Sequence, residues 1–279
     1  MVDSSEVSKH YQHGGLFERL LVALADDGVD PDQSTIEDLA PYDQFHGRGM
    51  EATLELAAVL RVSTGHHLLD VGSGIGGPAR FLAQRFGCRI TGLDLTEEFC
   101  AVARRLTGLL GLEDRVAFQQ GDALDMPFAD GMFDGAYSMN VSMNIADKRR
   151  FYGEIHRVLR PGAWLVLSEL ARGPDGEPEY PTPWARSAET SFLATLPETV
   201  EGLEACGFTL EQSRDTVAET LAFGARSREM VERGEKPPQR AVQLIHGDLA
   251  SVAMANSKNG IEQSRLVPIE VLCRKPEQG

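Results

Sequence analysis

Short apolar runs rich in β-forming residues recur between residues 66 and 170, and each of them predicts a strand. Between the second and third runs, apolar residues follow the spacing of one helix face. Thr96 precedes this stretch as a candidate N-cap, and Glu97 and Glu98 suit the positive end of a helix dipole. The predicted strands are 66–72, 88–95, 115–122, 133–140 and 163–170, and the apolar helix positions are Phe99, Val102, Ala103, Leu106 and Leu110.

Two further helices are predicted by the same spacing. One begins after Asp147, and the sequence Arg-Pro-Gly at 160–162 is expected to end it. The other lies at 49–60 and is expected to pack beside the first strand. Strands that alternate with helices predict a parallel sheet covered on both faces, with ligands bound at the carboxyl ends of its strands. The apolar positions are Phe151, Ile155, Val158 and Leu159 in the first of these helices, and Leu54, Ala57, Ala58 and Leu60 in the second.

The turn after the first strand, "LLDVGSGIGG" at 68–77, fits two different glycine patterns. Gly72, Gly74 and Gly77 form G-x-G-x-x-G, which in dinucleotide enzymes wraps a pyrophosphate. Asp70 also begins D-x-G-x-G-x-G, and its carboxylate would then lie beside that anion. A ligand with an amino group and a sulfonium cation tolerates the carboxylate and still needs glycines for close backbone approach.

Acidic residues end the next two predicted strands. Asp94 lies at the end of the second strand, where a carboxylate can accept hydrogen bonds from both ribose hydroxyls. Asp122 lies at the end of the third, where it can meet an adenine amino group while Ala123 leaves room for the ring. A dinucleotide site shares the first of these features but does not require the second.

These segments resemble the successive motifs of class I S-adenosylmethionine-dependent methyltransferases. The matching stretches are "LLDVGSGIGGPARFLA", "ITGLDLT", "VAFQQGDALDMPFADGMFD" and "RVLRPGAWLVLSE". Within that superfamily they resemble the type 11 branch, which includes ubiquinone-type, tocopherol-type, sugar-O and sarcosine/dimethylglycine methyltransferases. The resemblance implies a Rossmann-like seven-stranded α/β sheet with helices on both faces and the last strand antiparallel, with sixth and seventh strands near "LPETVEGLEACGFTLEQS" and "VPIEVLCRKP".

The resemblance also implies S-adenosylmethionine as cofactor, S-adenosylhomocysteine as product, and a role for individual residues. Gly72, Ser73 and Gly74 would face the methionine part, Asp94 the ribose, and Leu95, Asp122 and Ala123 the adenine. Asn140 would lie near the sulfonium. Asp70 is interpreted either as a site carboxylate or as a structural one that ties down loop amides, and Asp134 as structural.

The rest of the chain is expected to form a mainly helical cap. Residues 1–65 precede the first strand as an N-terminal helical segment, and 66–279 form the methyltransferase domain with cap insertions at about 171–196 and 218–266, which are too long for plain connections. Related small-molecule methyltransferases fold the N-terminal segment over the cofactor. Tyr11 and His46 are therefore the candidate catalytic residues, with a capping or surface role as the alternative for each. The loop around Trp184 is either a lid or pinned to the core.

Composition restricts the partners. The chain has 279 residues, 42% of them hydrophobic, and 27 Lys and Arg against 42 Asp and Glu, for a formal net charge of -15. Such a surface repels phosphate backbones, so no nucleic acid partner is expected. The stretch "SMNVSMNI" lacks the Asn/Asp-Pro-Pro-aromatic run of enzymes that methylate DNA amines. No apolar run is long enough to span a membrane, and the polar start lacks a signal core, so a cytoplasmic location is expected.

The four cysteines show no C-x-x-C spacing and are interpreted as buried reduced thiols, and no metal site is expected. The reaction is then an in-line displacement that depends on alignment of a small-molecule acceptor and on exclusion of water. The sarcosine/dimethylglycine resemblance favours N-methylation of a small amine. O- or C-methylation of a phenolic, sugar or isoprenoid compound is the alternative, and a dinucleotide-dependent oxidoreductase or a non-catalytic binding protein is the more remote one.

Overall fold

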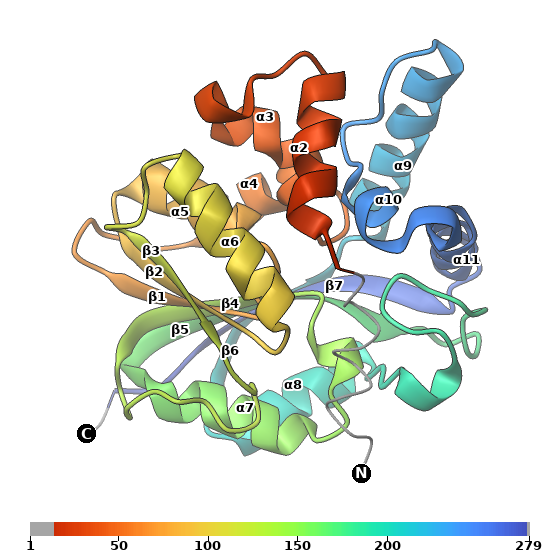
Figure 1. Cartoon of the computed structure of the whole chain (residues 1–279). Helices are drawn as coiled ribbons and strands as arrows, with labels where there is room; N and C mark the ends of the chain where they lie inside the picture. Colours follow the sequence, from red (N-terminus) through yellow and green to blue (C-terminus); the bar gives the residue numbers. More distant parts are fainter. Residues whose placement is uncertain (1–13, 278–279) are drawn as a thin grey trace.

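A seven-stranded sheet forms the centre of the computed structural model, which describes residues 14–277 (Figure 1). Its strand order is β3-β2-β1-β4-β5-β7-β6. The strands are β1 (His67–Val71), β2 (Arg89–Asp94), β3 (Val116–Gln120), β4 (Phe133–Met139), β5 (Leu159–Arg172), β6 (Thr209–Asp215) and β7 (Leu266–Arg274). All five strands predicted from the apolar runs are therefore confirmed, with ends that differ by a few residues.

The direction of pairing follows the expected class I arrangement. β1 pairs in parallel with β2 and β4, so that Asp70 lies opposite both Gly92 and Tyr137. β7 pairs antiparallel with β5 on one side and β6 on the other. The predicted fold class, with the last strand antiparallel, is confirmed. Because the inner strands are parallel, their carboxyl ends meet at one edge of the sheet.

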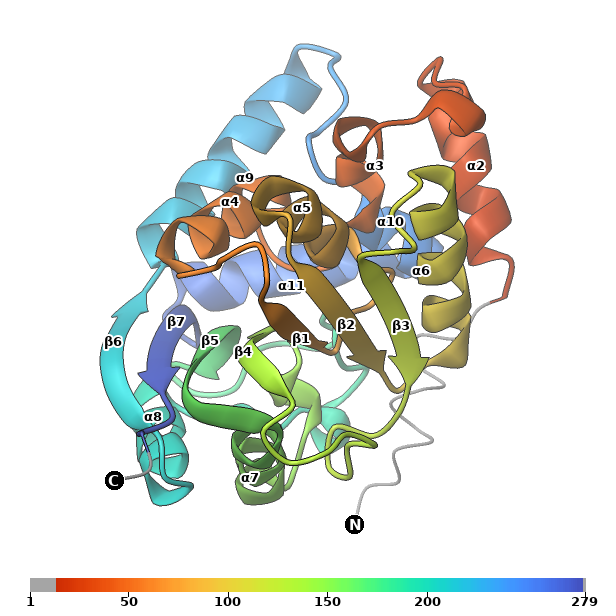
Figure 2. The ribbon, with the colours of Figure 1, turned by 90° about the vertical axis from the view of Figure 1, so that its left-hand side faces the viewer.

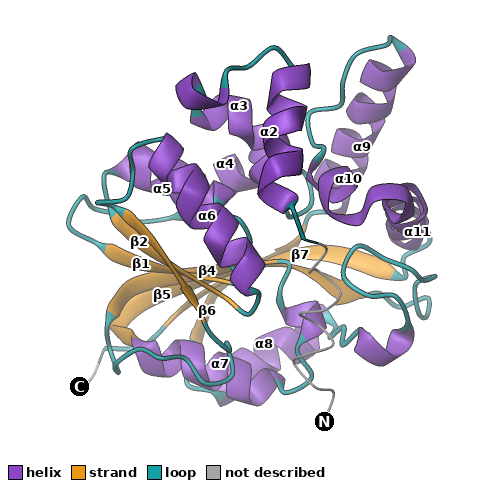
Figure 3. Ribbon diagram, viewed as in Figure 1, coloured by secondary structure: helices purple, strands orange, loops and turns teal. Residues whose placement is uncertain are grey.

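Helices cover both faces of the sheet (Figures 2 and 3). α4, α5 and α6 pack on one face through a core that includes Leu68, Ile90 and Val166. α7 and α8 pack on the other face, against Leu69, Leu165 and Leu167. These helices are α4 (Met50–Val59), α5 (Gly77–Phe86), α6 (Glu97–Leu109), α7 (Lys148–Val158) and α8 (Leu196–Ala205).

The predicted packing face of α4 is partly wrong. Ala57 and Leu60 are buried as expected, but the Leu54 side chain is 45% exposed and Ala58 is exposed. The helix packs instead through Ala52 and Leu56, which lie one turn apart on the face that α5 and the sheet cover. Its apolar residues are spread around the helix, so periodicity alone could not select the buried face.

α7 and β5 correct a second boundary. α7 begins after Asp147 as predicted, and the Asp147 side chain caps it by accepting a hydrogen bond from the N–H of Arg150. The helix ends at Val158, before the Arg-Pro-Gly sequence, and the chain enters β5 at Leu159. Leu159 already pairs with Phe133 of β4, so sheet pairing rather than the proline sets this boundary.

The cap consists of two groups of helices. The first contains α2 (Leu16–Asp26), η1 (Pro31–Gln33) and α3 (Ile36–Asp43), and its apolar side chains pack on Phe99, Val102 and Leu106 of α6. The second contains α9 (Val217–Glu232), α10 (Ala241–His246), η4 (Gly247–Leu249) and α11 (Ala250–Glu262). Among the described residues, no helix is long and apolar enough to cross a membrane.

A connecting segment between α9 and α10 joins the two groups. The side chains of Lys236 and Arg240 both form ion pairs with Asp27 at the end of α2. The Gln239 amide donates a hydrogen bond to the Gln44 carbonyl at 2.8 Å. The cap is thus closed by contacts between residues almost 200 positions apart in the sequence.

Candidate active site

A cavity of about 330 Å³ lies at the carboxyl ends of β1, β2 and β4. All eight residues that the sequence nominated for the cofactor line this one cavity: Gly72, Ser73, Gly74, Asp94, Leu95, Asp122, Ala123 and Asn140. Their convergence follows from the parallel sheet, which brings the ends of strands distant in sequence to the same edge.

The amides of the glycine-rich loop are bound within the protein. The N–H groups of Gly72 and Ser73 donate to the Leu93 carbonyl at 2.8 and 3.1 Å, and the N–H of Gly74 donates to Asp94 at 2.8 Å. A loop that cradles phosphate must point such N–H groups at the anion. With these amides occupied, and with the carboxylates of Asp70, Asp94 and Asp122 in the cavity lining, the loop disfavours a pyrophosphate.

Gly72 requires the absence of a side chain. Its φ of 75° is in the left-handed region, and a Cβ there would lie 2.2 Å from the Cγ2 of Val141. The close approach brings the loop after β1 against the loop after β4. The two loops therefore form adjoining walls of the cavity.

Asp94 connects the glycine loop to α6. Besides the Gly74 N–H, its carboxylate accepts the N–H of Thr96 at 2.9 Å. Thr96 occupies the predicted N-cap position of α6, but its side chain makes no capping hydrogen bond. Burial raises the pKa of Asp94 to about 6, although these hydrogen bonds oppose the shift.

Asp70 does not tie down the loop amides. Its side chain is 3% exposed, and its Oδ2 makes no hydrogen bond of good geometry to a described residue. Burial and, to a lesser extent, the charge of Asp94 raise its pKa to about 7, against the effect of the nearby Tyr137 hydroxyl. The Ser73 hydroxyl is likewise buried without a partner among the described residues. Two polar atoms in the cavity wall thus lack a protein partner, and a ligand can supply it.

Asp134, by contrast, has a structural role, as expected. Its carboxylate accepts the N–H of His67 at 2.7 Å and pairs with Arg160 at 2.6 Å, at the amino ends of β1 and β4.

Asn140 forms the boundary to a second cavity. Its backbone is left-handed, with a φ of 56°. Its side-chain amide can accept from the Gly47 N–H at 3.1 Å and donate to the Ser168 carbonyl at 3.3 Å, and so joins β4 to the cap. Together with Phe45 and His46, Asn140 lines both cavities.

The second cavity has a volume of about 460 Å³. It lies between the sheet and the second group of cap helices, and much of its wall is apolar. The apolar residues include Met143, Leu170, Trp184, Leu221, Phe223 and Ile245. A cavity of this size and character suits an organic ligand.

His46 is buried at the junction with both ring nitrogens in contact with protein groups. Nδ1 lies 3.1 Å from the Gly47 carbonyl, and Nε2 lies 3.1 Å from both Gln44 Oε1 and Thr53 Oγ1. Burial lowers its pKa to about 4, so the imidazole is neutral at physiological pH. The other catalytic candidate, Tyr11, lies outside the described residues.

A buried polar chain continues from this histidine. The Gln44 amide donates to Asp43 at 3.0 Å, and Asp43 accepts from Arg80 of α5 at 2.9 Å. Arg80 is fully buried and Asp43 nearly so. The chain fixes the loop that separates the two cavities, and no sequence motif marked Asp43 or Arg80 in advance.

The comparison with protein families agrees with this geometry. Residues 69–167 match the family model described as "Methyltransferase domain". Over residues 69–167 the chain is therefore similar to a methyltransferase domain. This segment runs from β1 through most of β5, and it includes all eight nominated cofactor residues.

Proteins similar to this chain are found in several organisms. The chain is 36% identical over 171 residues to "Methyltransferase GfsG" of Streptomyces halstedii, a match that covers 60% of this chain and 58% of that protein. It is 42% identical over 100 residues to "Probable tocopherol O-methyltransferase, chloroplastic" of Oryza sativa subsp. japonica, covering 36% and 28%. The matches thus span less than two thirds of either relative.

Solved structures share the fold over a longer part of the chain. A putative sarcosine dimethylglycine methyltransferase from Galdieria sulphuraria covers 82% of this chain and 84% of its own, with a TM-score of 0.64 and 19% identity. The [4+2]-cyclase SpnF covers 95% and 96%, with a TM-score of 0.68 and 24% identity. Since one of these neighbours is named a cyclase, the shared fold alone does not define the reaction.

The matched segment, residues 69–167, supplies only part of the second cavity. The segments around Trp184 and α9 to α11, all outside the matched residues, supply much of the rest. Trp184 both lines the cavity and is pinned to the core, since it is 3% exposed and its Nε1 donates to Ser191 at 3.0 Å. The sequence indicated insertions here from their length and named the loop around Trp184 as a candidate lid, but no pattern identified the other lining residues.

Proposed function

We propose that the protein transfers a methyl group from S-adenosylmethionine to an oxygen or carbon atom of a largely apolar small molecule. The observation that carries the proposal is the junction of the two cavities at Phe45, His46 and Asn140. One cavity has the carboxylates and the glycine loop of the methyltransferase domain. The other is large and largely apolar, so donor and acceptor can meet at their common boundary.

The residues of the first cavity fit S-adenosylmethionine. The Asp70 Oδ2 and the Ser73 hydroxyl, which make no hydrogen bond to the described residues, suit the amino and carboxylate groups of its methionine part. Asp94 would bind the ribose hydroxyls, and Asp122 and Ala123 the adenine. The Oδ1 of Asp122 accepts the N–H of Leu124 at 2.8 Å, which orients its carboxylate. When bound, this cofactor supplies a methyl group on a sulfonium centre.

The second cavity favours an apolar acceptor over a small amine. Sarcosine or dimethylglycine would fill little of 460 Å³ and would leave apolar walls without contacts. The preference for N-methylation drawn from the sequence is therefore not carried forward. Among the relatives, the tocopherol O-methyltransferase and the sterol 24-C-methyltransferase of Eremothecium gossypii have names that specify oxygen and carbon acceptors.

The role proposed for the chain's own residues is alignment and exclusion of water. Phe45 and Asn140 hold the boundary through which donor and acceptor meet. His46, neutral and held at both nitrogens, keeps the loop between the cavities in place. We assign it a positioning role in preference to that of a general base.

Calorimetry and a product assay test the proposal. The protein should bind S-adenosylmethionine and S-adenosylhomocysteine saturably and should show no affinity for NAD, NADP or FAD. Formation of S-adenosylhomocysteine should then be measured with sarcosine, dimethylglycine, phenols, isoprenoid alcohols and larger apolar alcohols. Turnover of the larger apolar compounds supports the proposal. Preferential binding of a dinucleotide, turnover of the amines alone, or tight cofactor binding without any methyl transfer would each contradict it.

A further inference from the structure

Two non-glycine residues in the wall of the second cavity, which we call the acceptor cavity, have left-handed backbones. Arg48 has a φ of 63° and Asn140 a φ of 56°, and both line the acceptor cavity. Side chains other than glycine disfavour this region, so the surrounding structure must hold such residues there. Asn tolerates it because its short side chain bonds locally, but arginine has no such advantage. Arg48 is therefore held against its backbone preference in the wall of the second cavity.

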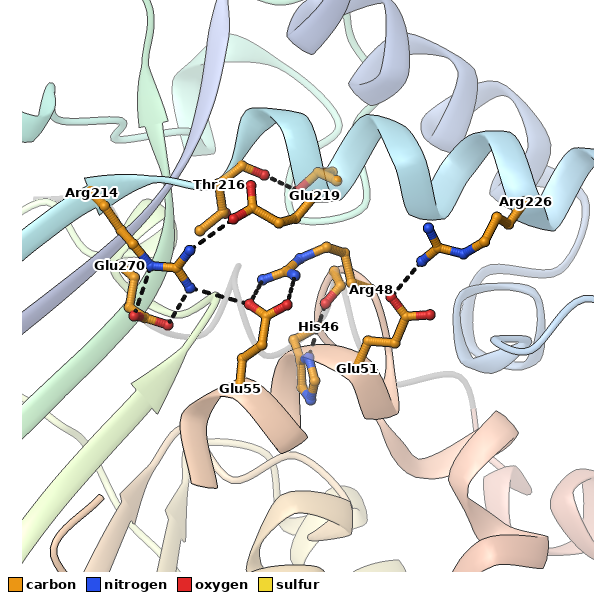
Figure 4. A network of polar contacts seen from close by, with 11 residues as sticks. His46, Arg48, Glu51, Glu55, Arg214, Thr216, Glu219, Arg226 and Glu270 are labelled. Atoms are coloured by element: carbon orange, nitrogen blue, oxygen red, sulfur yellow. Dashed lines mark hydrogen bonds and ion pairs between the residues drawn. The ribbon is translucent and has the colours of Figure 1, made fainter. Parts of the chain in front are cut away.

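A network of charges holds the Arg48 side chain (Figure 4). Its two Nη atoms donate to the two carboxylate oxygens of Glu55 in α4, at 2.6 and 2.9 Å. Arg214 of β6 contacts the same Glu55 at 3.2 Å. Burial by itself would raise the pKa of Glu55, but the hydrogen bonds and charges of these two arginines outweigh it and lower the pKa.

The network extends to the edge of the sheet and to the cap. Arg214 also pairs with Glu270 of β7 at 3.1 Å and with Glu219 of α9 at 2.8 Å. The orientation of Arg48 thus depends on groups from four separate elements. An isolated surface ion pair has a single partner, whereas this network involves several charged residues. It therefore holds the Arg48 guanidinium in one orientation.

Arg48 has donors left over for a ligand. Its side chain is 5% exposed, and within residues 14–277 its hydrogen bonds go to Glu55. A guanidinium has more N–H groups than the two that Glu55 occupies. Leaving such donors unpaired beside an apolar cavity is unfavourable, whereas an oxygen of a bound ligand can accept from them.

We infer that Arg48 selects acceptors that carry a carbonyl or carboxylate oxygen, by donating a hydrogen bond to that oxygen. Arg48 lines the second cavity but not the first, and it is two residues along the chain from His46, which lines both. The inference rests on the proposed function, because it assigns the second cavity to the acceptor. Arg48 is then a specificity-determining residue for the reaction.

Matched probes test this selection in protein saturated with S-adenosylhomocysteine. The probes are 4-tert-butylbenzoate, 4-tert-butylacetophenone and the hydrocarbon 1-tert-butyl-4-isopropylbenzene, and binding is followed by the fluorescence of Trp184, with Trp184→Phe to verify the signal. The two oxygen-bearing probes should bind at least about tenfold more tightly than the hydrocarbon, as a hydrogen bond from a charged donor implies. Arg48→Met should abolish this preference and leave hydrocarbon affinity within about twofold.

Arg226→Met is the control variant. Arg226 pairs with Glu51 in the same region at 2.6 Å but lines neither of the two cavities (Figure 4). This variant should retain the preference for oxygen. If Arg48→Met does not fold, Arg48→Lys, which keeps the charge but not the paired bonds to Glu55, should reduce the preference in part.

The inference is overturned if the wild-type protein shows no preference for the oxygen-bearing probes or does not bind them. It is also overturned if the Arg48 variants lose hydrocarbon binding and melting temperature together while the preference persists, since Arg48 would then be purely structural. Calorimetric binding of S-adenosylhomocysteine by the same protein separates these results from a failure of the proposed function.

Discussion

The N–H of Gly74 donates to the carboxylate of Asp94 at 2.8 Å and so joins the glycine-rich loop to the end of β2. Asp94 therefore has two tasks, because it organises the loop and, in the proposed function, binds the ribose. We expect Asp94→Ala to weaken S-adenosylhomocysteine binding by on the order of 1.5 to 3 kcal/mol, the range for hydrogen bonds to a charged group. Calorimetry measures this loss.

Asp134→Ala is the matched control for that experiment. It removes a carboxylate that also accepts a backbone N–H, that of His67, but at the opposite end of the sheet. It should lower the melting temperature without changing cofactor affinity. If Asp94→Ala lowers the melting temperature but binds the cofactor as tightly as the wild-type protein, Asp94 organises the loop and does not bind the ribose.

Replacing Asp70 is expected to raise the stability of the protein but to weaken its binding of the cofactor. Its pKa is raised from an ordinary value of 3.8 to about 7, so the folded protein holds this proton more tightly than the unfolded chain. Stability therefore falls as pH rises between those values, and above pH 7 the ionised carboxylate destabilises the ligand-free protein. Asp70→Asn should raise stability at pH 8, by on the order of 1 to 3 kcal/mol, relative to wild type, and have little effect near pH 4.

Thermal unfolding of both proteins at several pH values measures this difference. Asp70→Asn should at the same time weaken S-adenosylhomocysteine binding at pH 8, because the amide cannot replace a carboxylate as partner of an ammonium group. A stability difference that does not vary with pH, or unchanged affinity, contradicts the assignment of Asp70 to the cofactor's amino group.

His46 is expected to affect acceptor binding more than chemistry. Its pKa of about 4 keeps it neutral between pH 5 and 8, and both nitrogens face protein groups. His46→Ala should lower kcat/KM for the acceptor by about tenfold, mainly through KM, and should leave the pH profile unchanged between pH 5 and 8. Steady-state kinetics over that pH range decide between the roles. A loss of about 10² or more in kcat would instead identify His46 as a general base.

Breaking the buried ion pair of Asp43 and Arg80 is expected to lower the stability of the protein strongly. Asp43→Ala leaves the Arg80 charge uncompensated in the core and should reduce the free energy of unfolding by about 3 to 5 kcal/mol, measured by urea denaturation. The exposed pair of Arg104 and Glu97 is the control, and Glu97→Ala should cost less than about 1 kcal/mol. Similar losses in the two variants would show that Arg80 finds other partners.

The sequence by itself determined strands β1 to β5 of the sheet and the residues at their carboxyl ends that line the first cavity. Apolar runs marked five strands, and residues at the carboxyl ends of those runs, such as Gly72, Asp94 and Asn140, line one cavity. This succeeds because each strand is a local pattern and parallel strands must end at the same edge. The position of a residue along its own strand therefore fixes its place in the site.

Only the tertiary structure decided which residues line the second cavity, the proposed acceptor site. Leu54 is exposed and Leu56 buried because α5 and the sheet, not the helix's own pattern, select the covered face of α4. Arg48, with its left-handed backbone, is held through Glu55 and Arg214. It lines the second cavity together with residues of helices that lie more than 160 residues further along the chain. Pairings at such separation leave no periodic signal in a single sequence. These contacts form only when the cap helices pack against the sheet, because the charged and apolar groups that meet there come from segments far apart in the sequence.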